Sequence, residues 1–198
     1  MKNILFVCTG NTCRSPMAEG MLRKLSQGRG ISLDVRSAGV AAMEGMPISQ
    51  HAEAVLQDQQ IEDQLASKPL SSDLVEWADL ILTLTLSHKQ YAIRQFPHAA
   101  DKVHTLKEFT ENDESVLRDL EEQDQLLASM EMARSLGEEL QEKDRIRLIE
   151  LRQRIPSFDI SDPFGGTLED YQATAAEIRT ALFRLLDKLE NEEQQDRP

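Results

Sequence analysis

The most constraining feature of the chain is a strand–loop–helix pattern at its start, where residues 3–16 read NILFVCTGNTCRSP. The apolar run Ile4–Val7 has the length and composition of a buried strand. Pro16 suits the first position of a helix, and the residues after it are good helix formers. Between these elements, Gly10 and Asn11 tolerate unusual backbone angles. The segment therefore predicts a curled loop, with inward-facing N–H groups, between a strand and a helix N-terminus.

Strand-like and helix-like segments alternate through most of the chain. The predicted strands are 4–8, 33–37, 79–84 and 102–106, and the predicted helices lie near 16–29, 48–60, 87–96 and 168–190. Such alternation favours a parallel sheet with helices on both faces. We expect an α/β fold with a flavodoxin-like (Rossmann-like) open four-stranded sheet, and the curled loop at its carboxyl edge.

Residues 112–157 do not follow this alternation, because they are rich in charge and in helix formers. The first part of the segment is acidic, the later part is basic, and Gly137 marks a break between them. We expect a helical insertion within a single domain of residues 1–198. It is suited to cover the pocket, to bind a partner or to pair two subunits, and a solvated appendage is the alternative. Its apolar residues at rough helical spacing are Val116, Leu120, Leu127, Met130, Leu140, Leu148, Leu151 and Ile155.

The curled loop combines a nucleophile with a cation. Cys8 and Arg14 are separated by five residues. Inward amides, the helix N-terminus and the Arg14 guanidinium each favour the thiolate, which is the reactive form of cysteine. A planar guanidinium can also hold two phosphoryl oxygens at once. We expect the Cys8 sulfur to attack phosphorus and form a phosphocysteine. The loop residues expected to bind substrate are Thr9, Gly10, Asn11, Thr12, Cys13 and Ser15.

Residues 8–19, CTGNTCRSPMAE, resemble the signature of the low-molecular-weight protein tyrosine phosphatase family. Residues 36–39 (RSAG) and 162–166 (DPFGG) agree with it. The resemblance is strongest to the bacterial protein-arginine-phosphatase branch, which carries Thr where the tyrosine phosphatases usually carry an aliphatic residue. Thr12 occupies that position. The resemblance implies the open α/β fold and a hydrolase of phosphorylated proteins that needs no metal or other cofactor.

By this resemblance, Asp162 is the general acid for the leaving group and then the base for water. Taken alone, Asp-Pro is only a turn signal. Thr12 favours phosphoarginine because its hydroxyl suits a hydrogen-bonding guanidinium, and phosphotyrosine is the alternative. Phe164 belongs to the substrate site, but it can stack on either group and does not discriminate between them.

Supporting side chains are also expected to fix the conformation of the curled loop. Ser15 is placed to donate a hydrogen bond to the sulfur of Cys8. Asn11 and Ser37 resemble the pair that holds the loop shape in the family. The family often has a histidine in this network, whereas the aligned position here is Leu65. The loop is therefore braced differently, or the alignment is shifted.

Cys13 is the only other cysteine of the sequence. Two cysteines do not form a disulfide framework, and no signal peptide precedes them, so we expect a cytoplasmic protein. Cys13 either forms a reversible disulfide with Cys8 under oxidant or simply packs within the loop. A non-catalytic reader of phosphorylated sites, or a redox sensor, is the alternative to an enzyme. The set of Cys8, Arg14 and Asp162 favours the enzyme.

The overall charge restricts the class of partner. The net charge of −13 disfavours nucleic acid, since no basic face is evident. No apolar run approaches membrane-spanning length. The four histidines are scattered without metal-ligand spacing. The expected partners are therefore phosphorylated proteins, and the oligomeric state stays open.

Overall fold

The chain, as a computed structural model, is described over residues 2–139 and 141–195. It folds as two compact units. One unit contains the residues up to Thr110 together with those from Phe158 onward, and the other is Glu111–Ser157. All residues predicted to form the phosphate site belong to the first unit.

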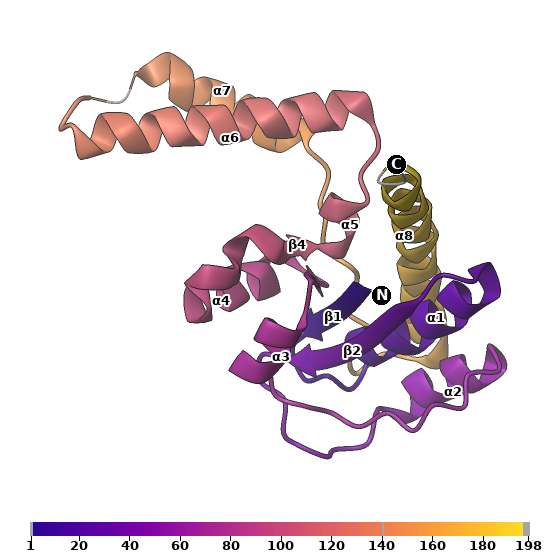
Figure 1. The fold of residues 1–198 in the computed structure, drawn as a ribbon. Coiled ribbons are helices and arrows are strands. Elements are labelled where there is room, and N and C mark those ends of the chain that lie inside the picture. The colour runs from indigo at the N-terminus through magenta and orange to yellow at the C-terminus, as the bar shows by residue number, and fades with distance from the viewer. Residues whose placement is uncertain (1, 140, 196–198) are drawn as a thin grey trace. The chain divides into compact units, whose positions relative to one another are not determined.

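The first unit is built on a four-stranded parallel sheet with the strand order β2-β1-β3-β4 (Figure 1). In this sheet Cys8 pairs with Gly39 on one side, and Val7 pairs with Thr83 on the other. The predicted open parallel sheet is confirmed, and the carboxyl end of the interior strand β1 leads directly into the curled loop. The strands are β1 (Lys2–Cys8), β2 (Leu33–Gly39), β3 (Leu80–Thr83) and β4 (Val103–Thr105).

Helices cover both faces of the sheet, as predicted for a parallel sheet buried on both sides (Figure 1). No helix in the described part of the chain is both long and apolar enough to cross a membrane. One face is covered by α1 (Arg14–Arg29), α2 (Gln50–Asp58) and α8 (Leu168–Gln195), and the other by α3 (Ser72–Trp77) and α4 (Leu86–Gln95).

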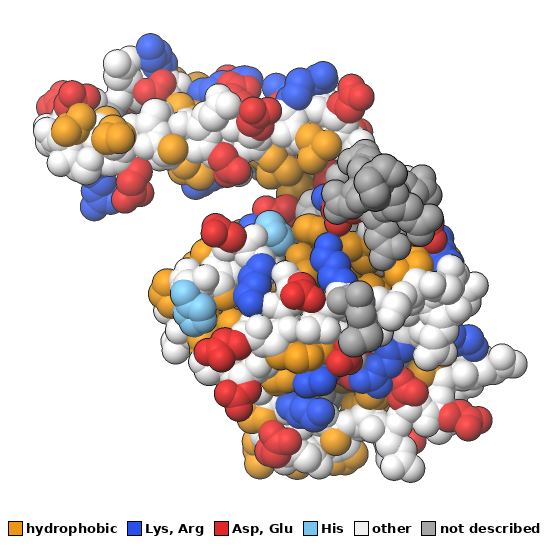
Figure 2. All heavy atoms as spheres, viewed as in Figure 1, with side chains coloured by type: hydrophobic (Ala, Val, Ile, Leu, Met, Phe, Trp, Pro, Cys, Tyr) orange, Lys and Arg blue, Asp and Glu red, His pale blue; other side chains and the backbone are white. Residues whose placement is uncertain are grey.

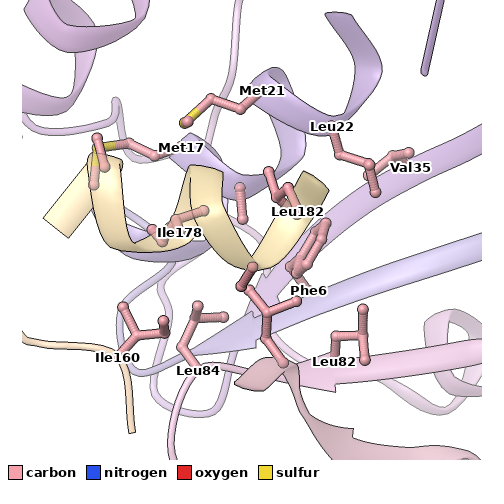
Figure 3. Close-up of a cluster of buried hydrophobic side chains, with 14 of the residues drawn as sticks. Phe6, Met17, Met21, Leu22, Val35, Leu82, Leu84, Ile160, Ile178 and Leu182 are labelled. Carbon is pink, nitrogen blue, oxygen red and sulfur yellow. The ribbon is translucent and has the colours of Figure 1, made fainter. Parts of the chain in front are cut away.

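The side chains of β1 alternate between two hydrophobic layers. Ile4, Phe6 and Cys8 point into the layer shared with α1 and α8. Leu5 and Val7 point into the layer under α3 and α4. Figure 3 shows Phe6 beside a side chain of α8 in the first layer. Cys8 therefore lies on the sheet face that α1 covers.

The boundaries of several elements differ from the predictions. Helix α1 begins at Arg14, so Pro16 is its third residue and not its first. This position is tolerated because the N–H groups of a first helical turn have no partner within the helix. Three short elements were not predicted, since they are too short to show a period: α3, η1 (Pro97–Lys102) and α5 (Leu106–Phe109).

The second unit is a hairpin of two helices, α6 (Glu114–Ser135) and α7 (Glu142–Arg154). Gly137 follows α6 with a φ of 73°, a left-handed conformation that suits glycine and ends the helix. Of the predicted apolar stripe, Leu148 and Leu151 are buried and Leu127 is exposed, while Leu140 lies outside the described residues.

Ion pairs join the two arms of the hairpin. Arg147 donates to both carboxylate oxygens of Glu122, at 2.6 and 2.7 Å, and Arg154 lies 2.9 Å from Asp119. The hydrogen bond to Glu122, more than any other contact, raises the pKa of Arg147. Figure 2 shows charged side chains of both signs interspersed with hydrophobic ones over α6 and α7. The acidic and basic arms of the segment thus pair with each other. That this unit is an insertion within a single phosphatase domain stays a prediction.

Candidate active site

The loop after β1 curls around the sulfur of Cys8. The Cys8 side chain is buried, and its Sγ lies 3.0 Å from Ser15 Oγ. The backbone N–H of Asn11 donates to the same sulfur at 3.3 Å. Asn11 has a φ of 54°, so it supplies the left-handed residue of the loop. Gly10 was predicted to share that role, but it is not among the residues with positive φ.

Gly39, at the end of β2, lets the loop approach the sheet closely. The N–H of Val40 donates to the carbonyl of Cys8, and the N–H of Ala41 donates to the carbonyl of Thr9, both at 2.9 Å. A Cβ at position 39 would lie 2.5 Å from the Thr9 carbonyl oxygen and 2.9 Å from the Asn11 nitrogen. Any side chain at this position would therefore push the loop away from β2.

A buried hydrogen-bond network lies behind the loop. The Asn11 Nδ2 donates to Ser15 Oγ at 2.8 Å and to Ser37 Oγ at 2.7 Å. The backbone N–H of Lys68 donates to Asn11 Oδ1 at 2.8 Å. The structure thus brings together the predicted pair Asn11 and Ser37. Leu65, at the position expected for a histidine, instead packs against the hydrophobic core.

Arg14 and Asp162 meet across the opening of the loop. The Arg14 Nη2 donates to Asp162 Oδ2 at 2.8 Å, and its Nη1 donates to the carbonyl of Ile160 at 3.3 Å. The side chain of Arg14 is 6% exposed, whereas that of Asp162 is 54% exposed. A buried cation therefore faces a carboxylate that remains accessible to a ligand.

The segment that carries Asp162 is attached to the first unit at several points. The N–H of Ile160 donates to the carbonyl of Leu84, just after β3, at 2.8 Å. The N–H of Ser161 donates to Glu177 of α8 at 3.1 Å. The carboxylate of Asp162 is thus placed by the sheet and by α8, which the spacing of the sequence does not reveal.

These residues surround a cavity of about 220 Å³. The exposed ring of Phe164 lies at the edge of this cavity. Asn11 and Ser15, which were predicted to bind substrate, do not line the cavity, because their side chains are fully buried in the network behind the loop. The lining residues are Cys8, Thr9, Gly10, Thr12, Cys13, Arg14, Asp162 and Phe164.

The sequence interpretation missed the role of His88 at the start of α4. Its Nε2 lies 2.9 Å from Thr9 Oγ1, and its Nδ1 lies 2.8 Å from Thr85 Oγ1. Burial, followed by the nearby charge of Arg14, lowers the pKa of His88 to about 4. The imidazole is therefore neutral at neutral pH and holds the residue after Cys8. No motif in the sequence connects positions 9 and 88.

Cys13 faces a tyrosine of α8. Its Sγ lies 3.1 Å from the hydroxyl of the buried Tyr171. Burial, and then the contact with Cys13, raises the pKa of Tyr171. Both cysteines are free thiols in the structure. The reversible Cys8–Cys13 disulfide stays a prediction. Among the described residues, no group of His, Cys, Asp or Glu side chains is arranged to hold a metal ion.

Comparison with known proteins decides the family. The family model described as "Low molecular weight phosphotyrosine protein phosphatase" matches residues 3–124. The chain belongs to this family. Membership makes the protein a cysteine-dependent phosphatase of phosphorylated proteins, and so an enzyme and not a non-catalytic reader.

Relatives within the low-molecular-weight phosphatase family match almost the whole chain. A protein-arginine-phosphatase of Geobacillus stearothermophilus is 35% identical over 96% of this chain and 97% of its own length. The low-molecular-weight protein-tyrosine-phosphatase PtpB of Staphylococcus aureus is 33% identical over 93% of this chain and 96% of its own. Relatives that match nearly the whole chain are therefore named both as arginine phosphatases and as tyrosine phosphatases.

Solved structures of the family share the fold. The YwlE arginine phosphatase from Geobacillus stearothermophilus superposes with a TM-score of 0.72 at 33% identity, covering 100% of this chain and 99% of that one. A mutant YwlE arginine phosphatase with a phosphorylated active-site serine in place of cysteine gives a TM-score of 0.70 at 32% identity, covering 95% of each chain. The latter shows a phosphorylated residue in the active site of a relative.

Proposed function

We propose that the protein hydrolyses phosphoarginine on proteins, with Cys8 as nucleophile, Arg14 as the phosphoryl-binding cation and Asp162 as general acid and base. The observation that carries the choice of substrate is Thr12, which lies on the wall of the cavity that holds these three residues. The names of relatives that match nearly the whole chain support it.

Thr12 gives the cavity wall a polar, small side chain. A phosphoarginine presents a planar guanidinium with several N–H donors, and a threonine hydroxyl can accept one of them. A phosphotyrosine presents an apolar ring, which an aliphatic residue at position 12 would contact better. Phosphotyrosine is the second candidate substrate, and the exposed ring of Phe164 together with the PtpB relatives supports it.

The first chemical step transfers the phosphoryl group to sulfur. The substrate phosphoryl takes the place of the Asp162 carboxylate on Arg14, and the loop amides bind its remaining oxygens. The Cys8 thiolate attacks phosphorus, an S–P bond forms, and the P–N bond to arginine breaks. Asp162, which takes up a proton from solvent when the phosphoryl group displaces it from Arg14, gives that proton to the departing nitrogen, because this nitrogen is strongly basic and leaves poorly as an anion.

The second step hydrolyses the phosphocysteine. Asp162, now a carboxylate, takes a proton from water as the water oxygen attacks phosphorus. The S–P bond breaks, inorganic phosphate leaves, and the sulfur becomes a thiolate again. Ser15, 3.0 Å from the sulfur, is placed to stabilise that thiolate with a hydrogen bond.

Matched peptides test the proposal. Two peptides of identical sequence, one with phosphoarginine and one with phosphotyrosine, are compared for phosphate release without added metal. We expect kcat/KM to be at least roughly tenfold higher for phosphoarginine, and Cys8→Ser to abolish both reactions. A higher value for phosphotyrosine would assign the protein to the second substrate class. If neither peptide nor p-nitrophenyl phosphate is hydrolysed, the proposed catalytic function is refuted.

We further propose that the protein works in the cytoplasm, because the mechanism needs Cys8 as a free thiol and a reducing compartment maintains it. The hairpin Glu111–Ser157 is proposed as an insertion within a single phosphatase domain. Its exposed apolar residues support a role in partner binding or self-association, which light scattering of the full chain tests. These residues are Leu117, Leu127, Met132, Leu136, Ile146 and Ile149.

A further inference from the structure

A buried carboxylate is connected to the active-site sulfur by a continuous chain of hydrogen bonds. Glu19 lies on α1, faces β2 and is 7% exposed. Its Oε2 accepts a hydrogen bond from the hydroxyl of Ser37, and its Oε1 pairs with Arg23. From Ser37 the chain continues through Asn11 and Ser15 to Cys8.

The charge of Glu19 determines which way the first of these bonds points. A carboxylate has no hydrogen and only accepts, so the single hydroxyl hydrogen of Ser37 is directed to Glu19. Ser37 Oγ must then accept from its other neighbour, the Asn11 Nδ2, at 2.7 Å.

The orientation of the Asn11 amide is fixed from two sides, by Ser37 as the acceptor for Nδ2 and by Lys68 as the donor to Oδ1. The backbone N–H of Lys68 donates to Asn11 Oδ1, so the oxygen of the amide faces Lys68. The two hydrogens of Nδ2 are then directed to Ser37 and Ser15. Ser15 Oγ accepts one of them.

The direction of the last hydrogen bond, between Ser15 and Cys8, follows from the orientation of the Asn11 amide. Because Ser15 Oγ accepts from Asn11, its own hydrogen is left for one of two acceptors. Cys8 Sγ lies at 3.0 Å and the carbonyl of Ala38 at 3.4 Å, so the sulfur is the nearer acceptor. A hydroxyl that donates to sulfur stabilises the thiolate relative to the thiol.

We propose that Glu19 is a positioning residue of the phosphatase site, which directs the Ser37–Asn11–Ser15 chain so that Ser15 donates to the Cys8 thiolate. The inference deepens the proposed function, because it rests on Cys8 as the nucleophile. Arg23, one turn further along α1, holds the other oxygen of Glu19 and also donates to the carbonyl of Val35.

The charged groups around Glu19 come from two segments. Arg23 lies on the same helix, and Lys68 and Asp63 lie in the segment between α2 and α3. Burial raises the pKa of Glu19, while the hydroxyl of Ser37 and the charges of Arg23 and Lys68 act in the opposite direction. The charge on Glu19 therefore depends on these partners.

The test measures the thiolate and not the turnover. In Glu19→Gln the amide oxygen can stay on Arg23, which turns the NH₂ group toward Ser37 and reverses the direction of that bond. The pH dependence of iodoacetamide alkylation, followed at Cys8 by mass spectrometry, reports the thiolate fraction. We expect alkylation near pH 6 to be roughly tenfold slower in Glu19→Gln, because a hydrogen bond to a charged atom is lost.

The matched control is Asp63→Asn. Asp63 is the other carboxylate on Arg23, bound to its Nη1 at 3.2 Å, and it lies outside the chain that runs from Ser37 to Cys8. Asp63 has the smallest effect on the pKa of Glu19 among these groups, so the alkylation profile of Asp63→Asn should lie much closer to that of the wild-type protein than that of Glu19→Gln does. Since the readout needs no substrate, it separates this inference from the identity of the phosphorylated substrate.

A double variant distinguishes positioning from general loosening of the fold. In Ser15→Ala the sulfur has already lost its donor, so adding Glu19→Gln should change the alkylation profile less than twofold. Ser37→Ala breaks the same chain while it retains Glu19, and it should slow alkylation as Glu19→Gln does. An unchanged profile in folded Glu19→Gln and Ser37→Ala, or fully additive effects with Ser15→Ala, would overturn the proposal.

Discussion

The guanidinium of Arg14 donates to the carboxylate of Asp162 at 2.8 Å, although 148 positions separate the two residues in the sequence. The pair places the proposed acid directly beside the proposed phosphoryl-binding cation. In the proposed mechanism, a phosphoryl group that enters the cavity brings its own negative charge to Arg14 and releases Asp162 to face the leaving group.

Asp162→Asn should separate chemistry from binding. The amide cannot give the leaving group a proton, so we expect the first chemical step to fall about 10²- to 10⁴-fold. Rapid-quench measurement of phosphocysteine formation checks this, and the inhibition constant of inorganic phosphate should change little because Arg14 remains. Asp187→Asn, at an exposed ion pair with Arg29, is the control and should retain normal rates. Normal phosphocysteine formation in Asp162→Asn would remove Asp162 as the acid.

Thr12→Ile should shift substrate preference. The aliphatic side chain removes the hydroxyl from the cavity wall and adds apolar surface, so the ratio of kcat/KM for phosphoarginine over phosphotyrosine peptides should fall by roughly tenfold or more. Thr12→Ser keeps the hydroxyl and should keep most of the ratio. Equal ratios in the wild-type protein and both variants would refute the role given to Thr12.

Gly39→Ala should destabilise the loop. Its Cβ would meet the Thr9 carbonyl oxygen at 2.5 Å, and neither backbone segment can move without breaking hydrogen bonds of the loop. We expect a loss of about 1–3 kcal/mol in the free energy of unfolding, with a lower kcat/KM. Gly28→Ala is the control. It lies on α1 with nothing within 4 Å of its Cβ, and it should stabilise the protein slightly. Equal melting temperatures of the two variants would contradict this account.

His88 should make stability depend on pH in the mildly acidic range. The unfolded imidazole takes up a proton below its ordinary pKa near 6.5, whereas the folded one does so only near pH 4. Between these values the unfolded state binds more protons, so stability falls as the pH drops from about 6.5 to about 4. Over this pH range, the titration of His88 lowers the free energy of unfolding by an amount of order 3 kcal/mol.

Denaturant unfolding at pH 7, 5.5 and 4 measures this effect. His88→Asn removes the titrating group, and its unfolding free energy should change less with pH over the same range, even though the variant is less stable at pH 7. A pH dependence that is identical in both proteins would show that His88 is not its source.

The two-helix hairpin should depend on the pairing of Arg147 with Glu122. Arg147→Glu places two carboxylates together and should speed amide hydrogen exchange in α6 and α7. Adding Glu122→Arg restores an opposite-charge pair and should return exchange toward that of the wild-type protein. Exchange that is equally fast in the single and double variants would show that this ion pair does not hold the helices together.

Much of the candidate site could be predicted because its main parts are local. Cys8 and Arg14 lie on one short loop, whose composition and position after an apolar run indicate a strand, a curl and a helix. The same local logic predicted the parallel sheet, since its long strands and helices show clear periods. Short elements such as α3 and α5 were missed, because they are too short to show one.

The sequence by itself thus determined the curled loop, the sheet and the class of chemistry, because adjacent residues along a chain restrict one another's backbone directly. Only the tertiary structure decided that Glu19 faces Ser37, that His88 holds Thr9 and that Gly39 must lack a side chain. Each of these contacts joins separate elements. Their distances and hydrogen-bond directions depend on how helices pack against the sheet, which no spacing along the chain specifies.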